Sequence, residues 1–238
     1  MTRNTYRLII RTGSALGLVA LLFAMPVGST THAASRVTVP FKMGMVSQNP
    51  LDKIAATYQK HPRLEAAFEF RYFRNEQDQN GAAESGTLLL DQQSGKYRIT
   101  LPGQVLISDG KSQWAILKDV EEVQVTEMDH SSNSINPSNV FSFFTSGYSH
   151  KVLPGEQVGS TPLQVIELTP TERGTSFSKV IIRAHRDNHE LYDVTVFDRN
   201  KSKYSYQIRS LNTNPKIADQ NFVFNKAEFP GMEIVDLR

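Results

Sequence analysis

Histidine and carboxylate side chains that lie close together in sequence are the first candidates for chemistry. His185 and His189 are four residues apart, with Asp187 and Glu190 beside them. On a helix, this spacing would place two imidazoles on one face, as a metal site requires. Residues 186–188 read Arg-Asp-Asn, however, which is typical of a turn between two strands. We therefore expect an exposed hairpin tip here and no metal site.

Other acidic positions could act as general acids or bases. Glu121 and Glu122 are adjacent, and adjacent side chains on a strand point to opposite faces, so they cannot easily share a substrate atom. Asp109 precedes Gly110, a dipeptide typical of a two-residue hairpin turn. The chain has no cysteine and lacks the motifs of serine hydrolases, zinc proteases, phosphate-binding loops and dinucleotide-binding folds. We expect neither an enzyme nor a resident cofactor.

The composition is that of a globular protein. The chain has 238 residues, of which 39% are hydrophobic and 21% are charged. A chain of this length can bury a core without disulfides or metals, and all-β domains often reach this size as one unit. Beyond the N-terminus no apolar stretch is long enough to span a bilayer, which excludes a polytopic membrane protein.

Residues 1–33 have the pattern of a secretory signal peptide. Three arginines precede the apolar stretch Gly13–Met25, which is short for a membrane span. Thr31-His32-Ala33 fits a cleavage site, so we expect processing after Ala33 and a periplasmic mature protein. An uncleaved anchor is the alternative.

Removal of this segment changes the net charge. The whole chain carries 26 basic and 24 acidic residues, and residues 1–33 contain three arginines and no acidic residue. The mature chain then has 23 basic and 24 acidic residues, a net charge of −1. No basic run remains, so the electrostatic signature of nucleic-acid binding is absent.

After an extended lead-in over residues 34–50, residues 51–238 form one domain with many strand patterns. Phe68, Phe70 and Tyr72 alternate with polar residues, as in a strand with one buried face. Further strands are expected at residues 84–91, 96–101, 104–108, 112–117, 122–128, 151–153, 163–169, 177–184, 190–198, 202–211, 222–224 and 232–237. About eleven strands joined by short turns predict a mostly β fold with a strongly curved antiparallel sheet.

Two or three short helices are expected to cover the concave side of this sheet. Leu51, Ile54 and Tyr58 repeat at helical spacing before a His-Pro pair. A second helix over residues 139–145 follows Pro137. Its apolar residues are Val140, Phe141, Phe143 and Phe144.

Apolar side chains at alternating positions of consecutive strands are expected to line the concave side. They are Phe68, Phe70, Tyr72, Leu88, Leu90, Tyr97, Ile99, Trp114 and Ile116. A packed core explains any one of them. Together they exceed what a few short helices can fill, so we expect a partly vacant hollow that binds an apolar ligand.

Six motifs, taken in order, give the sequence a resemblance to a known family. They are Gly86–Leu88, Gly95–Arg98, Ser108–Trp114, Glu122–Val125, Asn136–Tyr148, and Phe222–Phe224 with Pro230–Arg238. The sequence resembles the LolA-type periplasmic carriers of outer-membrane lipoproteins, in a variant similar to that of Bacteroidota. The resemblance extends over residues 51–238.

The resemblance implies an unclosed β-barrel that shields acyl chains, with the helices as a lid. It implies acylated lipoproteins as cargo, an inner-membrane Lol-type ABC transporter as donor and an outer-membrane acceptor. At about 0.8 kcal/mol for each buried CH₂ group, one long acyl chain gains on the order of 10 kcal/mol. We expect a monomer.

One segment departs from the family pattern. Many of these carriers have an arginine just before the third strand that bonds to the lid and holds it shut. Residues 91–95 here read Asp-Gln-Gln-Ser-Gly. A glutamine can hydrogen-bond a lid carbonyl, although without charge assistance. Lys96 and Arg98 are alternative substitutes.

Two further functions stay open at this point. LolA-like folds also occur as lipid-sensing regulators of the cell envelope, usually with an additional domain. The same hollow could carry another amphiphile, such as a glycolipid or a pigment. The lipids and proteins bound in the periplasm distinguish a carrier from a sensor.

Overall fold

The computed structural model describes residues 49–75, 82–128, 137–172 and 174–238. The predicted signal peptide, and all of the lead-in except its last two residues, lie outside the described part of the chain and stay predictions. Among the described residues, no helix combines the length and the apolar character needed to cross a membrane.

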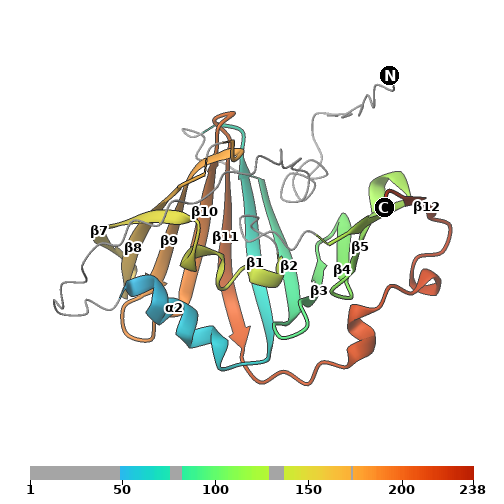
Figure 1. Cartoon of the computed structure of the whole chain (residues 1–238), viewed down its shortest axis with the longest axis horizontal. Helices are drawn as coiled ribbons and strands as arrows, with labels where there is room; N and C mark the ends of the chain where they lie inside the picture. The colour runs from blue at the N-terminus through green and yellow to red at the C-terminus, as the bar shows by residue number, and fades with distance from the viewer. Residues whose placement is uncertain (1–48, 76–81, 129–136, 173) are drawn as a thin grey trace, which may run out of the picture.

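One curved sheet of twelve strands makes up most of the described protein (Figure 1). Its order is β12-β6-β5-β4-β3-β2-β1-β11-β10-β9-β8-β7. The strands are β1 (Arg63–Phe73), β2 (Ala82–Asp91), β3 (Lys96–Thr100), β4 (Gln104–Ser108), β5 (Ser112–Leu117), β6 (Glu122–Glu127), β7 (Tyr148–Val158), β8 (Thr161–Pro170), β9 (Phe177–His185), β10 (Leu191–Asp198), β11 (Lys203–Asn212) and β12 (Glu233–Asp236), and the 3-10 turn η2 (Lys118–Val120) joins β5 to β6. The sheet is not closed into a barrel, because β7 and β12 remain as edges. The predicted fold class is confirmed.

The strand prediction differs from the structure near the C-terminus. β12 pairs with β6 in parallel, whereas the other neighbouring strands pair antiparallel. The chain reaches β6 through a long crossing, so no hairpin imposes antiparallel pairing there. The strand predicted at residues 222–224 is wrong, since the 3-10 turn η5 (Asp219–Phe222) ends at this point.

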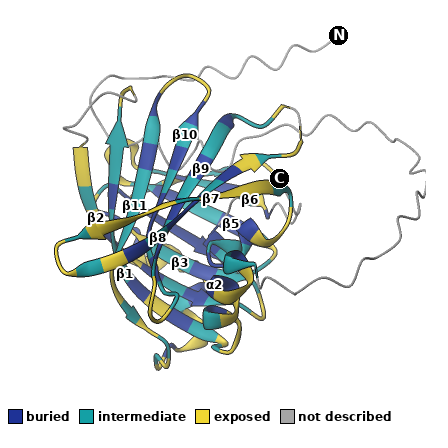
Figure 2. Ribbon diagram, turned by 90° about the vertical axis from the view of Figure 1, so that its left-hand side faces the viewer, coloured by how far each residue is buried: buried dark blue, intermediate teal, exposed yellow. Residues whose placement is uncertain are grey.

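The two faces of the sheet differ in polarity. We call the concave face, which carries the helix α2 (Pro50–Gln59), the inner face, and the opposite one the outer face. In β1, Leu64 and Phe70 are buried on the inner face, while Glu65 and Glu69 lie on the outer face. Figure 2 shows buried positions concentrated in the interior of the sheet, whereas the edge strand β7 is exposed along most of its length.

The local sequence explains where α2 begins and which side it buries. The side chain of Asn49 accepts a hydrogen bond from the Leu51 N–H at 3.1 Å, and Pro50 takes the first turn, where no N–H is needed. The buried residues are Leu51, Ile54, Ala55 and Tyr58. α2 crosses the inner face at the end where β1 begins (Figure 1).

The helix predicted over residues 139–145 is wrong in form. Two 3-10 turns, η3 (Pro137–Asn139) and η4 (Phe143–Thr145), stand in its place. The bond from the Ser142 N–H to the Asn139 carbonyl, at 2.8 Å, spans only three residues. Aromatic and β-branched residues lose side-chain freedom in an α-helix, and the tighter turn places several phenylalanines on the sheet in a short length.

The C-terminal segment covers the outer face of β3 to β6. Phe224 and Phe229 pack there in a second apolar cluster, separate from the main core. The turn η6 (Lys226–Glu228) lies between them, and Glu228 forms an ion pair with Arg98 of β3 at 2.9 Å. This part of the sheet is therefore apolar on both faces, and all five residues of β4 are buried.

The buried tyrosines give the fold a defined response to alkaline pH. Burial raises the pKa of Tyr148 and Tyr204 to about 12, and it raises the pKa of Tyr58 and Tyr97 further. Above pH 10, the ordinary pKa, the unfolded chain loses protons that the folded chain keeps. We predict that the free energy of unfolding falls as the pH rises from 10 to about 12. Urea unfolding at a series of pH values measures it, and a constant value would contradict the prediction.

Candidate functional site

Seven of the nine side chains predicted to line the concave side lie together on the inner face. Cross-strand partners share a face, and the register sets Leu88 opposite Ala66 and Ile99 opposite Leu88. The seven are Phe68, Phe70, Tyr72, Leu88, Leu90, Tyr97 and Ile99. Four of them belong to the buried core, and the other three are half-buried against it. Lipid binding by these residues stays a prediction.

The predicted positions of Trp114 and Ile116 are wrong. Both pack into the outer-face cluster beneath the C-terminal segment, where the ring of Trp114 stacks on Phe224 at 5.8 Å. The inner side of β5 presents Gln113 and Ala115 instead. The alternating apolar residues of β5 therefore pack into the outer-face cluster and not into the main core.

Gly86 makes room for an aromatic ring on the inner face. It pairs with Phe68 across β1 and β2. A Cβ atom at Gly86 would lie 2.6 Å from Cζ of Phe68 and 2.7 Å from Cδ2 of Leu101, both closer than normal van der Waals contact. The absence of a side chain thus lets the Phe68 ring lie over β2.

Side chains of α2 and of residues 137–145, which we call the lid, cover the inner face. The predicted lid residues Leu51, Ile54, Tyr58, Phe141, Phe143 and Phe144 are buried, and Val140 is half-buried. The rings of Tyr58 and Phe141 stack at 4.3 Å, which joins the two parts of the lid. The ring of Phe143 meets that of Phe144 edge to face at 5.3 Å.

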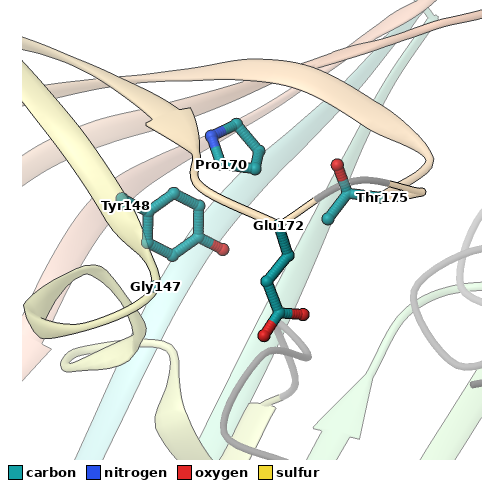
Figure 3. A pocket seen from close by; sticks show the side chains of 5 residues that line it. All are labelled: Gly147, Tyr148, Pro170, Glu172 and Thr175. Carbon is teal, nitrogen blue, oxygen red and sulfur yellow. The ribbon is translucent and has the colours of Figure 1, made fainter. Parts of the chain in front are cut away.

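The lid side chains fill part of the space that the sequence led us to expect as a vacant hollow. Lid and sheet residues form one continuous core cluster. A small hollow of about 10 Å³ lies beside Tyr148 and Glu172 (Figure 3), and a polar groove of about 490 Å³ lies on the outer face between Arg98 and Asn221. None of the predicted cavity residues lines either of these. Six large apolar lid residues thus occupy part of the inner face where we expected a hollow, and a ligand-binding hollow on the rest of this face stays a prediction.

Hydrogen bonds from Gln92 and Leu191 fix α2 to the sheet. The amide nitrogen of Gln92 donates to the carbonyls of Tyr58 and His61, at 3.0 and 2.5 Å, at the C-terminal end of α2. The hydroxyl of Tyr58 accepts a hydrogen bond from the Leu191 N–H at 2.6 Å. Gln92 therefore bonds to lid carbonyls, as its position in the sequence suggested, in place of the arginine of the family pattern.

Polar residues interrupt the apolar surface at β4 and β5. Gln104, Ser108 and Gln113 are buried on the inner face, and the hydroxyl of Tyr97 donates to the carboxamide oxygen of Gln113. Leu106 and Ala115 are the apolar inner-face residues of β4 and β5, so the apolar surface narrows at these two strands.

At the end of the sheet opposite α2, the inner face is less covered. Tyr72 stacks on Tyr204 at 5.5 Å, and Phe70 contacts Tyr206 at 5.1 Å. Sequence reasoning missed Tyr204 and Tyr206 as site residues. The two tyrosines occupy alternate positions in β11, as residues on one face of a strand do. Only the long-range pairing of β11 with β1 shows that they continue the inner face of β1.

The turn after His185 and the turn at Asp109 are present as predicted, whereas Glu121, expected on a strand, lies in the turn before β6. His189 has φ 61° in the β9–β10 turn, and its Nδ1 lies 3.3 Å from the side chain of Gln164. The carboxylate of Asp109 accepts bonds from two turn N–H groups, and Glu121 has a left-handed backbone. No cluster of three potential metal ligands occurs among the described residues.

The sequence also matches a known family. The model of the outer membrane lipoprotein carrier protein LolA matches residues 64–225, which is most of the chain. The chain belongs to the LolA family.

Solved structures are similar to the chain at low sequence identity, and the one with a TM-score above 0.5 shows the same fold. An uncharacterized conserved protein from Thermus thermophilus is 8% identical with a TM-score of 0.53, over 81% of this chain and 99% of that one. A LolA superfamily protein from Nitrosomonas europaea is 12% identical (TM-score 0.41; 76% and 99% covered). A putative outer membrane lipoprotein-sorting protein domain from Vibrio parahaemolyticus is 13% identical (TM-score 0.43; 76% and 96% covered). No curated protein matches the chain.

Tyr58 offers a test of how the lid is attached. In Tyr58→Phe the stacking ring is kept, but the buried Leu191 N–H loses its acceptor. Leaving a buried donor unsatisfied costs about 1–3 kcal/mol. We predict that the free energy of unfolding, measured in urea, falls by this amount. An unchanged value would show that the hydrogen bond does not hold the lid.

Proposed function

We propose that the protein carries acylated lipoproteins between the two membranes of the cell envelope. Its inner face binds the acyl chains after the lid has moved aside. The observation that carries this proposal is a continuous apolar surface on an unclosed sheet, covered by apolar side chains of the lid that pack into the same core. Membership of the LolA family supports it.

The energies of the closed and the loaded state are of similar size. Burying one large apolar side chain contributes about 1.5–3 kcal/mol, so six lid side chains contribute roughly 9–18 kcal/mol. One long acyl chain contributes on the order of 10 kcal/mol. An acyl ligand can therefore replace the lid without an external energy source, and a better acceptor can remove the ligand again.

The proposed route needs export and two partners. The predicted signal peptide, residues 1–33, delivers the chain to the periplasm and is removed near Ala33. An inner-membrane ABC transporter of the Lol type supplies the cargo, and an outer-membrane acceptor receives it. The protein acts as a monomer, since one inner face is enough for the acyl chains, and it needs no catalytic group.

Binding of acyl chains to the purified mature protein tests the proposal. We predict that native mass spectrometry of protein isolated from the periplasm without detergent detects bound acylated species. We also expect an environment-sensitive fatty-acid probe to bind with saturation. Absence of both would remove the acyl-binding function. Identification of lipoproteins among the bound species separates the carrier from a sensor or from a carrier of other amphiphiles.

Gln92 tests whether the lid competes with the ligand. Gln92→Ala removes the bonds to the carbonyls of Tyr58 and His61, so the closed state loses about 1 kcal/mol or more. The probe should then bind roughly fivefold more tightly, while the free energy of unfolding falls. Gln93→Ala is the matched control, because this exposed neighbour makes no such bond among the described residues. Equal affinity of both variants would contradict a lid that must open.

A further inference from the structure

Tyrosines form a row across the inner face at the end of the sheet opposite α2. Tyr72 ends β1, Tyr204 and Tyr206 begin β11, and Tyr148 begins β7. Tyr72 stacks on Tyr204 at 5.5 Å, and Tyr206 contacts Phe70 at 5.1 Å. Tyr148 lies four strands from β11, on β7, and stacks on Phe177 at 6.2 Å. We call Tyr72, Tyr148, Tyr204 and Tyr206 the tyrosine row.

Three of the four hydroxyls in this row are candidate donors, since that of Tyr204 already donates to the Asp198 carboxylate. The Tyr204 hydroxyl lies 3.3 Å from both the Asp198 carboxylate and the Ser202 hydroxyl. Among the described residues, no hydrogen-bond partner is found for the hydroxyls of Tyr72, Tyr148 and Tyr206. That of Tyr148 points into the small hollow in Figure 3. Burial raises the pKa of Tyr148 to about 12.

The position of the row differs from that of the other aromatic residues. Phe141, Phe143 and Phe144 occupy the covered part of the inner face and carry no polar atom. Tyrosine has an apolar ring and a polar tip, and it is favoured where an apolar region meets water. A ligand made of hydrocarbon alone would gain nothing from this row of hydroxyls. A ligand whose polar groups begin there would gain hydrogen bonds.

We propose that the tyrosine row binds the ester carbonyls of a glycerolipid group, so that the acyl chains run toward α2 and the polar remainder leaves at this end. The inference rests on the proposed acyl-binding function and specifies the chemical class and orientation of the ligand. Ester carbonyls accept hydrogen bonds and lie at the boundary between acyl chains and polar head.

The charges near the row favour a neutral ester over a free fatty acid. Asp198 lies beside Tyr204, and Glu84 lies on the inner face opposite Phe70 of β1. A fatty-acid carboxylate would meet these two acidic groups, which would repel it. An ester places no charge there.

A comparison of ester and ether lipids tests the proposal. The probes are a synthetic lipopeptide with two ester-linked palmitoyl chains on glycerol and its ether-linked analogue, which has no carbonyls. The wild-type protein should bind the ester form roughly fivefold more tightly, as expected for about one net hydrogen bond. The double variant Tyr72→Phe/Tyr206→Phe, which keeps both rings, should bind the two forms equally. Tyr192→Phe, which packs against Arg183 on the outer face, is the control and should keep the preference.

The outcomes separate this inference from the proposed function. Binding of both lipopeptides with equal affinity to the wild-type protein would overturn the tyrosine-row proposal and leave acyl binding intact. A preference that persists in the double variant would overturn it as well. If neither lipopeptide binds, the proposed acyl-binding function fails, and the inference that depends on it fails with it.

Discussion

The inner face of the sheet is too apolar to remain in contact with water, and the rest of the structure depends on this constraint. An antiparallel sheet of this width curves, and its concave side has no second sheet to pack against. The lid supplies the missing layer with few residues: it consists of one helix of ten residues and two 3-10 turns. The protein is closed because its own aromatic residues cover the inner face.

The same constraint explains why the cover can be removed. The lid is held largely by non-directional apolar contact, and hydrogen bonds from Gln92 and from the Leu191 N–H to Tyr58 fix the position of α2. Apolar contact can be exchanged for contact with another apolar body of similar size at little net cost. Ion pairs occur elsewhere, on the outer face and at the C-terminal segment, where they join parts that need not move. Opening the lid breaks none of these ion pairs.

Alternation in the sequence predicted the curved sheet and the inner face of β1 to β3, because these strands have one buried and one polar face. It misplaced Trp114 and Ile116, since the outer face of β5 is also covered, by a segment more than a hundred residues later in the chain. It missed Tyr204 and Tyr206 because the pairing of β11 with β1 is non-local. The sequence also could not predict the free volume of the interior. Periodicity shows which residues are apolar but not whether a lid side chain fills the space between them.

Hydrogen exchange at the Leu191 amide tests the exchange of lid for ligand most directly. In the closed protein this N–H is bonded to the Tyr58 hydroxyl, so its protection reports whether α2 is seated. With a saturating acylated probe, we predict faster exchange at Leu191, while the amides paired between β1 and β2 remain protected. Unchanged or slower exchange at Leu191 with the probe bound would show that the ligand and the lid do not compete for the inner face.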